Sequence, residues 1–205
     1  MCSADAQKKE KEELKDMKQD IILAGVGGQG ILSIAFVIDH AAKKEGLNFK
    51  QAELHGMAQR GGGVQSHLRL SEGEIFSDLI PKGEADMILS VEPLESLRYL
   101  DLLNPEGILV TSSNPYVNIP DYPALDIVLE KIRSIKRAII VDSERLAKEA
   151  GSFKSQNIVM LGAASHSLII REESLIDFIE LLFRHRGEEL VEMNIKAFQL
   201  GRETV

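Results

Sequence analysis

The amino-acid sequence predicts an α/β fold: a single Rossmann-like domain with a mainly parallel sheet flanked by helices, and a helical C-terminal third. Two observations lead to this prediction. Short apolar runs typical of buried strands alternate with longer segments of helical periodicity, and from Asn157 onward the pattern is helical, with breaks near Arg171 and Gly187. Because strands that alternate with helices are joined by crossover connections, they form a largely parallel sheet that helices cover on both faces.

The first half of the domain is expected to begin with a strand, a helix and a second strand. Residues 21–24 form a short apolar run followed by glycine, as expected for a buried parallel strand. Residues 29–44 then show helical periodicity, with apolar side chains on one face. Residues 49–54 follow as the second strand, after a glycine that ends the helix.

Residues 64–70 are expected to form a strand with one solvent-exposed face, because apolar and polar side chains alternate along them. The alternation places Val64, Leu68 and Leu70 on one side and Gln65, His67 and Arg69 on the other. Residues 75–76 are apolar and are expected to pair beside this strand.

The second half continues the alternation of strands and helices. Further strands are expected at residues 85–91, 108–111 and 138–141. A helix from about Pro93 follows the first of them, and a turn over residues 104–107 precedes the second. Asp142 or Ser143 is suited to cap the helix after the third, because either side chain can accept a hydrogen bond from a free backbone N–H at a helix start.

Length and charge bound the organisation of the chain and its partners. The chain has 205 residues, which suits one domain, and we divide it into a charged N-terminal extension at 1–19 and a domain at 20–205. Its formal net charge is -8. Because nucleic acid requires a basic face and an anionic membrane surface attracts basic segments, we expect no nucleic acid and no membrane as a partner.

Cysteine and histidine usage leaves little room for metal chemistry on this chain. The single cysteine, Cys2, cannot ligate an iron–sulfur cluster or form an intrachain disulfide. No Cys, His and Asp residues stand at a spacing typical of a metal site, so no metal ligand is predicted. The lack of a long apolar run and of a signal-peptide pattern, together with the single cysteine, leads us to expect a cytoplasmic protein.

A glycine-rich turn between the first strand and the first helix is a candidate binding element. Residues 25–30 read Gly-Val-Gly-Gly-Gln-Gly, which contains the pattern G-x-G-x-x-G. Glycines permit a tight turn, and the start of the following helix offers free N–H groups to a phosphate. Glu53 lies roughly 20 residues further on, where dinucleotide-binding proteins carry an acidic residue. A dinucleotide site is therefore one alternative, and a turn that serves only tight packing of strand and helix is another.

A second glycine-rich loop follows the second strand. Residues 55–63 read His-Gly-Met-Ala-Gln-Arg-Gly-Gly-Gly, which is incompatible with regular structure. Because ligands of open parallel sheets bind outside the carboxyl ends of the strands, this loop and the turn at 25–30 are expected to share one edge. Arg60 can grip a carboxylate or phosphate through two parallel hydrogen bonds, with a surface salt bridge as the alternative. His55 is either part of the same site or a hydrogen-bonded residue at a strand end.

These two glycine-rich segments also carry a resemblance to a known family. Residues 25–32, 53–62 and 64–69 are similar to the beta subunit of indolepyruvate ferredoxin oxidoreductases and, more broadly, to the gamma subunit or domain of pyruvate and 2-oxoisovalerate ferredoxin oxidoreductases. Later segments agree at residues 83–86, 92–95 and 157–163 and at Arg98. The string at 55–62 is far more specific than the glycine turn alone. The chain departs from the family in its charged extension and at Gly63, where a small polar residue is expected.

The resemblance implies a two-subunit enzyme that oxidatively decarboxylates an aryl 2-oxoacid to an acyl-CoA and passes electrons to ferredoxin. It implies that thiamine diphosphate and the iron–sulfur clusters belong to the large (alpha) subunit and that coenzyme A is a cosubstrate. This chain is then a small subunit that binds no cofactor alone and is inactive alone. The alternatives are a stand-alone NAD(P)-binding dehydrogenase of the Rossmann type and a ligand-sensing protein.

The candidate site residues are those of the two glycine-rich segments, which we expect to face a phosphate of coenzyme A or the partner subunit. They are Gly25, Gly27, Gly28, Gln29, Gly30, His55, Gly56, Gln59, Arg60, Gly61 and Gly62. No catalytic residue is predicted, because neither the motifs nor the resemblance tells which atoms of this chain touch a substrate.

Overall fold

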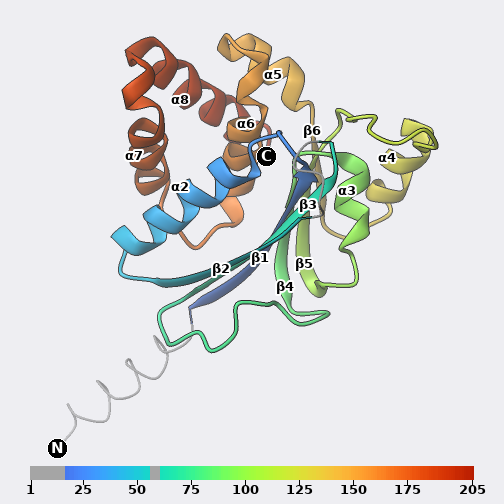
Figure 1. Cartoon of the computed structure of the whole chain (residues 1–205), viewed down its shortest axis with the longest axis horizontal. Helices are drawn as coiled ribbons and strands as arrows, with labels where there is room; N and C mark the ends of the chain where they lie inside the picture. Colours follow the sequence, from blue (N-terminus) through green and yellow to red (C-terminus); the bar gives the residue numbers. More distant parts are fainter. Residues whose placement is uncertain (1–16, 56–60) are drawn as a thin grey trace, which may run out of the picture.

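The computed structural model describes residues 17–55 and 61–205 and shows a six-stranded sheet with helices on both of its faces (Figure 1). The strands are β1 (Lys18–Val26), β2 (Asn48–His55), β3 (Gly63–Ser71), β4 (Ala85–Ser90), β5 (Leu103–Ser112) and β6 (Ala138–Val141). Their order across the sheet is β2-β3-β1-β4-β5-β6. Neighbours among β1, β4, β5 and β6 are parallel, whereas β3 is antiparallel to both β1 and β2. The predicted α/β class with a mainly parallel sheet is confirmed.

Strand β3 separates β1 from β2 but leaves their carboxyl ends at the same edge of the sheet. Because β3 is antiparallel to both, β2 points in the same direction as β1. The turn after β1 and the end of β2 therefore lie at the same edge. The two strands are not neighbours, and of the second glycine-rich segment the structure describes His55 and residues 61–63.

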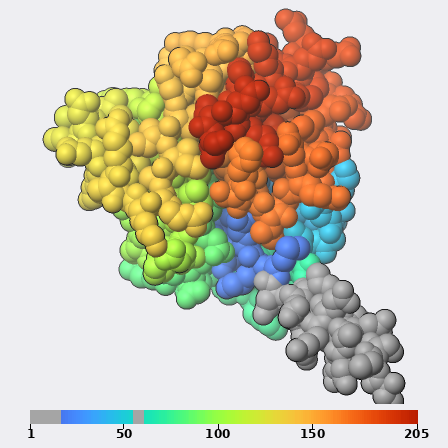
Figure 2. Space-filling view, turned by 180° about the vertical axis from the view of Figure 1, so that it is seen from behind, coloured from blue at the N-terminus to red at the C-terminus, as the bar shows by residue number. Residues whose placement is uncertain are grey.

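The helices form a layer on each face of the sheet. One layer contains α2 (Ile31–Lys44), α5 (Ser143–Ala150), α6 (Gln156–Ala164), α7 (Glu172–Phe183) and α8 (Glu188–Arg202), and the other contains α3 (Pro93–Arg98) and α4 (Leu125–Arg133). Two short 3-10 turns, η1 (Phe153–Ser155) and η3 (Arg184–Arg186), lead into α6 and α8. From behind, Figure 2 shows the orange and red C-terminal helices gathered on one side and the yellow and green segments on the other.

Both faces of the central strands are covered, and the side chains of β1 show this directly. Ile21 and Leu23 enter the core beneath α2 and α6, whereas Ile22, between them, enters the core beneath α3 and α4. All three are fully buried, as expected where successive side chains point to opposite faces of a doubly covered sheet. No helix in the described parts of the chain is long and apolar enough to cross a membrane.

Most predicted elements differ in extent by a few residues, and two of the differences change the local structure that was expected. Helix α2 begins at Ile31 instead of residue 29, because Gly30 has a φ of 80° and so lies outside the right-handed helical region. Strand β5 begins at Leu103 and runs through residues 104–107, where a turn was expected. The Asn-Pro-Glu-Gly sequence there resembles a turn, but it continues into a strand that pairs with β4.

The polar face of β3 is largely covered, whereas the sequence predicted that it is exposed to solvent. The segment between β3 and β4 crosses it, and His67 is only 4% exposed. The backbone N–H of Ile80 donates to His67 Nδ1 at 3.0 Å, and burial lowers the pKa of the imidazole. Arg69 forms a two-pronged ion pair with buried Asp20, at 2.7 and 2.9 Å. Residues 75–76, expected to pair beside β3, lie in the crossing segment outside any strand.

Helices α6 and α8 approach each other at two glycines. Gly162 of α6 faces the carbonyl oxygen of Phe198, and Gly201 of α8 faces the carbonyl oxygen of Val159. A Cβ atom at either glycine would collide with these backbone atoms, which cannot swing aside as the end of a flexible side chain can. The two glycines therefore set the short distance between the helices.

We predict that Gly162→Ala lowers the free energy of unfolding by about 1–3 kcal/mol, because α6 and α8 must move apart to admit the methyl group. The loss is expected even though alanine favours an isolated helix by about 1 kcal/mol over glycine. The matched control is Gly73→Ala, since the nearest atom to a Cβ there is Ser71 Oγ at 3.6 Å. Urea unfolding followed by circular dichroism measures both variants, and equal stability would contradict the close crossing.

Candidate functional site

The carboxyl edge of the sheet contains the crevice expected of an open α/β fold. The chain leaves β1 toward α2 on one face of the sheet and leaves the neighbouring strand β4 toward α3 on the opposite face. Where connections part in this way, the ends of two adjacent parallel strands open the space in which such folds bind ligands. Here that space lies between the turn at residues 25–30 and Val91, which follows β4.

The glycine turn at residues 25–30 is held by its own glutamine. The Val26 N–H donates to Gln29 Oε1 at 2.7 Å, and the Gln29 N–H donates to the Val26 carbonyl at 3.1 Å. Gly28 and Gly30 have φ angles of 105° and 80°, which residues with a side chain rarely adopt. Gln29 therefore shapes the turn through its side chain.

The turn and the start of α2 present free backbone N–H groups at this edge. Among residues 17–55 and 61–205, none accepts a hydrogen bond from the N–H of Gly28, Gly30, Ile31 or Leu32. Free amides at a helix start, combined with the positive end of the helix dipole, favour a bound anion. The geometry of the turn is thus compatible with a phosphate.

The two glycine-rich segments contact each other through the backbone. The Gly27 N–H donates to the Gly62 carbonyl at 2.9 Å, and the Gly61 N–H donates to the Gly27 carbonyl at 3.3 Å. These bonds join the turn after β1 to the residues that lead into β3, so the two segments form one continuous edge. His55 is the last residue of β2. The candidates Gly56, Gln59 and Arg60 lie outside the described residues.

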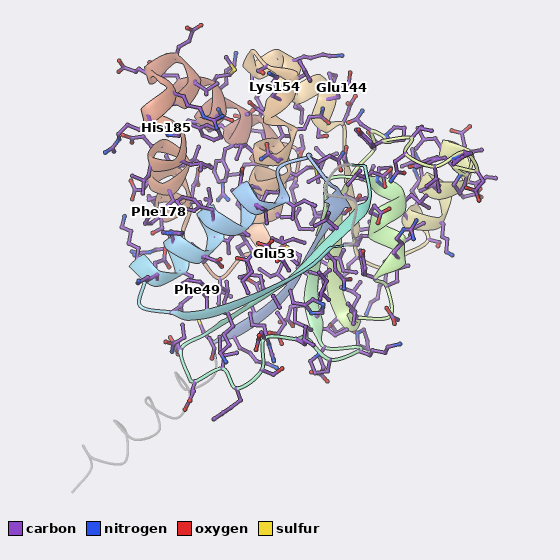
Figure 3. The ribbon with its side chains drawn as sticks, viewed as in Figure 1. Phe49, Glu53, Glu144, Lys154, Phe178 and His185 are labelled. Carbon is purple, nitrogen blue, oxygen red and sulfur yellow. The ribbon has the colours of Figure 1, made fainter. Side chains whose placement is uncertain are left out.

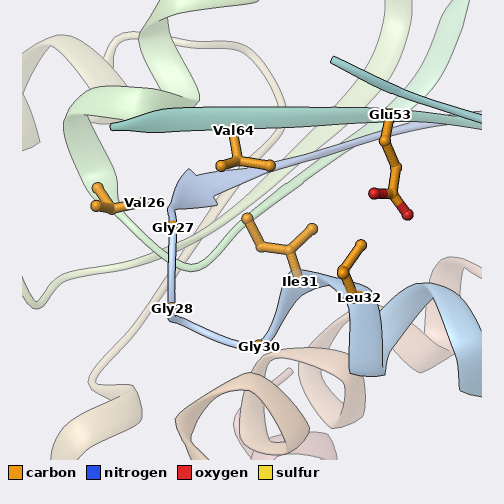
Figure 4. Close-up of a pocket in the computed structure, with 8 residues that line it drawn as sticks. All are labelled: Val26, Gly27, Gly28, Gly30, Ile31, Leu32, Glu53 and Val64. Atoms are coloured by element: carbon orange, nitrogen blue, oxygen red, sulfur yellow. The ribbon is translucent and has the colours of Figure 1, made fainter. Parts of the chain in front are cut away.

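A first cavity, of about 390 Å³, lies beside the turn on the α2 face of the sheet (Figure 4). It is lined by Val26, Gly27, Gly28, Gly30, Ile31, Leu32, Glu53 and Val64. The Glu53 carboxylate points from β2 toward Leu32 of α2. Because the other lining side chains are aliphatic, the cavity suits an uncharged group that donates a hydrogen bond to a carboxylate. Gly25, also a predicted site residue, lies within β1 opposite Val64 and does not line this cavity.

A second cavity, of about 660 Å³, adjoins the same turn at the starts of α6 and α8. It is lined by Gly28, Gln29, Gly30, Ser33, Val91, Tyr116, residues 152–157, Phe183, Arg186, Leu190 and Asn194. Lys154, labelled in Figure 3, and Arg186 give it positive charge, and none of its described lining residues is acidic. The two cavities differ in character, one apolar with a carboxylate and one polar with two cations.

Asn157 ties the glycine turn to α6. Its Nδ2 donates to the Gly30 carbonyl at 3.1 Å, and a Cβ at Gly30 would lie 2.6 Å from this amide nitrogen. Asn157, Lys154 and Arg186 were not among the predicted site residues, because no motif spacing connects them with the turn. The match of residues 157–163 to the family was the only signal near them.

Glu92 fixes the loop that brings Tyr116 to the second cavity. Its Oε1 accepts hydrogen bonds from the Tyr122 hydroxyl and from the Tyr116 N–H at 3.3 Å. Its Oε2 accepts a hydrogen bond from the Glu95 N–H at 2.7 Å, which caps α3. Burial, followed by the hydrogen bond to Glu92, raises the pKa of Tyr122 well above its usual value. This side chain therefore stays a neutral donor to the carboxylate.

A buried carboxyl group lies near Glu53. Asp39 of α2 is 4% exposed, and its Oδ1 has no hydrogen-bond partner within the parts of the chain described. Burial, with the negative charge of Glu53 as the second cause, raises the pKa of Asp39 to about 7. No three His, Cys, Asp or Glu side chains in residues 17–55 and 61–205 are grouped to hold a metal ion.

The sheet order, the glycine turn and the two cavities define a Rossmann-like α/β domain with a glycine-rich edge at its carboxyl side. Sequence comparison gives the family: residues 20–204 match the family model described as pyruvate ferredoxin/flavodoxin oxidoreductase. The chain belongs to this oxidoreductase family.

Two relatives place the chain more closely. It is 38% identical to indolepyruvate oxidoreductase subunit IorB of Methanothermobacter thermautotrophicus, over 90% of this chain and 96% of the relative. It is 34% identical to the subunit of the same name from Archaeoglobus fulgidus, over 90% of this chain and 94% of the relative. The resemblance inferred from the two glycine-rich segments is confirmed. The chain is therefore a subunit of the 2-oxoacid oxidoreductase class.

A solved structure has a similar fold. The 2-oxoglutarate:ferredoxin oxidoreductase from Magnetococcus marinus, with 2-oxoglutarate, coenzyme A and succinyl-CoA bound, matches with a TM-score of 0.73 at 24% identity. The match covers 91% of this chain but only 31% of that chain. The fold of this chain thus corresponds to about a third of a longer polypeptide in that enzyme.

We predict that Asp39→Asn removes a pH dependence from the stability of this domain. The folded chain keeps the Asp39 proton up to about pH 7, whereas the unfolded chain releases it near the ordinary pKa of 3.8. Between these values the folded state binds more protons, so a rise in pH lowers the free energy of unfolding. The full difference is on the order of 4 kcal/mol, reached above pH 7.

Urea unfolding at pH 5 and pH 8 measures this effect. Wild-type protein should lose more stability between the two values than Asp39→Asn does. Asp126→Asn, an exposed change on α4, is the control for a lost carboxylate. An identical pH profile for wild type and Asp39→Asn would contradict a protonated Asp39.

Proposed function

We propose that this chain is the small subunit of an indolepyruvate-type 2-oxoacid:ferredoxin oxidoreductase and acts with a large subunit. The observation that carries the proposal is the 34% and 38% identity, over nearly the full length of both chains, to two subunits named for indolepyruvate. We further propose that the complex is cytoplasmic, since the chain has a single cysteine and suits a reducing compartment.

In the proposed reaction, a 2-oxoacid anion and coenzyme A give an acyl-CoA, carbon dioxide and one proton, and two electrons pass to ferredoxin. The bond between the carboxyl and oxo carbons breaks, and a thioester bond forms at the former oxo carbon. Thiamine diphosphate supplies carbanion stabilisation, and iron–sulfur clusters carry electrons. This chain offers no evident place for either group: Cys2 is its only cysteine, and in its described residues no three His, Cys, Asp or Glu side chains are grouped to hold a metal ion. The proposal assigns both to the large subunit.

The part of this chain in that reaction is to bind and orient. The free N–H groups of Gly28, Gly30, Ile31 and Leu32 are placed to hold a phosphate of coenzyme A without any particular side chain. The glycines joined at this edge clear space for a partner's backbone to come close. This role fits the predicted site residues, of which Gly27, Gly28, Gly30, Gly61 and Gly62 lie together at the edge.

A stand-alone NAD(P)-dependent dehydrogenase is favoured by one observation, the presence of Glu53 in the first cavity beside the glycine turn. The sheet order opposes it. In the dinucleotide-binding fold the acidic residue follows the strand next to β1, whereas here β3 lies between β1 and the strand of Glu53. The carboxylate is displaced by one strand spacing, about 5 Å, from the place where it would meet a ribose.

We predict that the chain shows no saturable binding of NADH at micromolar concentrations, a range that corresponds to about 8 kcal/mol of binding free energy. Isothermal titration calorimetry on the purified chain is the measurement. A micromolar binding isotherm that disappears in Glu53→Ala would instead support the hypothesis of a stand-alone dehydrogenase.

We predict that the chain, coexpressed with its large subunit, forms a complex that reduces ferredoxin only when an arylpyruvate and coenzyme A are both present. Each subunit alone should be inactive, and iron should appear in the complex but not in this chain. Indolepyruvate, pyruvate and 2-oxoglutarate tested side by side identify the preferred oxoacid. A complex whose activity does not respond to coenzyme A would refute the proposed function.

The same complex tests the second glycine-rich segment. We expect Arg60→Ala to cost about 2–5 kcal/mol of subunit affinity or of transition-state stabilisation, as is typical when a desolvated charge loses its partner. Arg133→Ala, an exposed change on α4, is the control. If Arg60→Ala behaves like the control in both subunit affinity and turnover, Arg60 is no longer a candidate site residue.

A further inference from the structure

The loop between β5 and α4, residues 113–124, belongs to no helix or strand but is held in place by a buried carboxylate. Glu92 is 1% exposed and follows β4, and its Oε1 accepts hydrogen bonds from the Tyr116 N–H at 3.3 Å and from the Tyr122 hydroxyl. Three residues of the loop are prolines, each of which fixes its own φ angle. The loop therefore has few alternative conformations around these two contacts.

Glu92 does more than cap α3. Its Oε2 accepts the capping hydrogen bond from the Glu95 N–H at 2.7 Å, a task that needs one acceptor and is usually performed by Ser, Thr, Asp or Asn. The longer side chain of Glu92 leaves a second oxygen for the loop, and within the described chain it forms no ion pair. Because a buried carboxylate is costly unless hydrogen bonds replace its hydration, the donors from the loop and from α3 must stay in place.

Asn118, which lies between the two tyrosines of this loop, reaches the second glycine-rich segment. Its Nδ2 donates a hydrogen bond to the Gly61 carbonyl at 2.8 Å. The Gly61 N–H donates in turn to the Gly27 carbonyl at 3.3 Å, and Gly61 has a φ of 77°. The backbone at Gly61 is thus held from two sides, by the turn after β1 and by the amide group of Asn118.

Glu95 of α3 packs against the same segment. Its Oε2 would lie 2.7 Å from a Cβ at Gly63, so a side chain fits at this position only if the carboxylate moves. The Glu95 side chain is 2% exposed, and its Oε1 accepts a hydrogen bond from Arg98 Nε at 3.0 Å. The segment therefore contacts two elements that Glu92 anchors, the loop at Gly61 and α3 at Gly63.

We propose that Glu92 and Asn118 are positioning residues that fix the second glycine-rich segment in the backbone arrangement that the large subunit binds, an inference that rests on the proposed function. Residues 61–63 are all glycine, so the surface that they offer to a partner is backbone, and only neighbouring contacts can fix its conformation. Glu92 holds the loop, the loop presents Asn118, and Asn118 holds the Gly61 carbonyl. The turn after β1 keeps its own shape through Gln29, so this route acts on assembly of the complex.

Amide hydrogen exchange of the full chain, followed by NMR, tests this route without the partner. Asn118→Asp keeps the size of the side chain but removes its N–H donors, and Glu92→Gln replaces one acceptor oxygen with a donor. We expect the Gly61 amide to exchange roughly fivefold faster in each variant, the effect of one lost hydrogen bond. Because both changes act through one loop, the double variant should exchange no faster than the faster single variant. Dividing by exchange at Leu23 in β1, which reports global opening, removes any loss of overall stability.

Asn48→Asp is the matched control for the exchange measurement. Asn48 Nδ2 likewise donates to backbone carbonyls, those of Glu72 and Gly73 at 3.2 and 3.0 Å, but it lies at the start of β2, at the opposite edge of the sheet. Tyr122→Phe removes one donor to Glu92 and keeps the ring, so it takes the place of Glu92→Gln if that variant does not fold.

Two results would overturn the route from Glu92 to Gly61. One is unaltered exchange at Gly61 in Asn118→Asp, and the other is a double variant in which the two effects add.

Coexpression with the large subunit tests the role in assembly. We expect Asn118→Asp to raise the dissociation constant of the two subunits roughly fivefold, whereas the KM of the assembled complex for coenzyme A should shift by less than about twofold. Faster exchange at Gly61 with an unchanged subunit affinity would overturn the role in assembly. A wild-type chain that binds no large subunit refutes the proposed function itself, and the exchange measurements on the chain alone still decide whether Glu92 and Asn118 fix the glycine segment.

Discussion

The antiparallel strand β3 between β1 and β2 is the constraint on which the candidate site depends. It pairs with β1 along the whole of that strand, from Lys18 opposite Ser71 to Val26 opposite Gly63. Because β3 begins beside the end of β1, the residues that lead into it reach the glycine turn and form the two hydrogen bonds with Gly27. The same insertion moves β2 to the edge of the sheet and carries Glu53 away from the turn. One strand thus sets both the joined glycine edge and the width of the first cavity.

The edge combines a neutral backbone at its centre with opposite charges on its two sides. The turn contributes amides, the β2 side contributes Glu53, and the side of α6 and α8 contributes Lys154 and Arg186. Charges arranged in this way orient a ligand more than they increase its affinity. An anionic group is attracted on the side of the two cations and repelled on the side of the carboxylate, so one orientation of the ligand is favoured. The buried Asp39 near Glu53 has a pKa raised to about 7, so it is largely neutral below that pH and adds its full negative charge on that side only above it.

The fold class and the glycine edge followed from the sequence because the signals for them are local. Apolar runs mark β1 and β4, and glycines stand at the positions that need a positive φ, such as Gly28 and Gly30. The second cavity had no local signal, since its cations lie 32 positions apart and meet only when α6 packs on α8. His67 shows the same limit, because alternation along β3 revealed which side chains share a face but not that another segment covers them. Asp39 looked like any polar residue on a helix until the packing of α2 was known.

The glycine contacts between α6 and α8 have a consequence for the rigidity of the second cavity. Lys154 stands at the entrance to α6 and Arg186 at the entrance to α8, and the two helices touch backbone to backbone through Gly162 and Gly201. Because backbone atoms are in contact there, no side chain can change its rotamer to let the helices shift past each other. The anchor points of the two cations are therefore fixed before any ligand arrives, and little conformational entropy remains to be lost at those points on binding. Two residues without side chains, deep in the helical layer, thus preorganise a charged surface to which neither of them belongs.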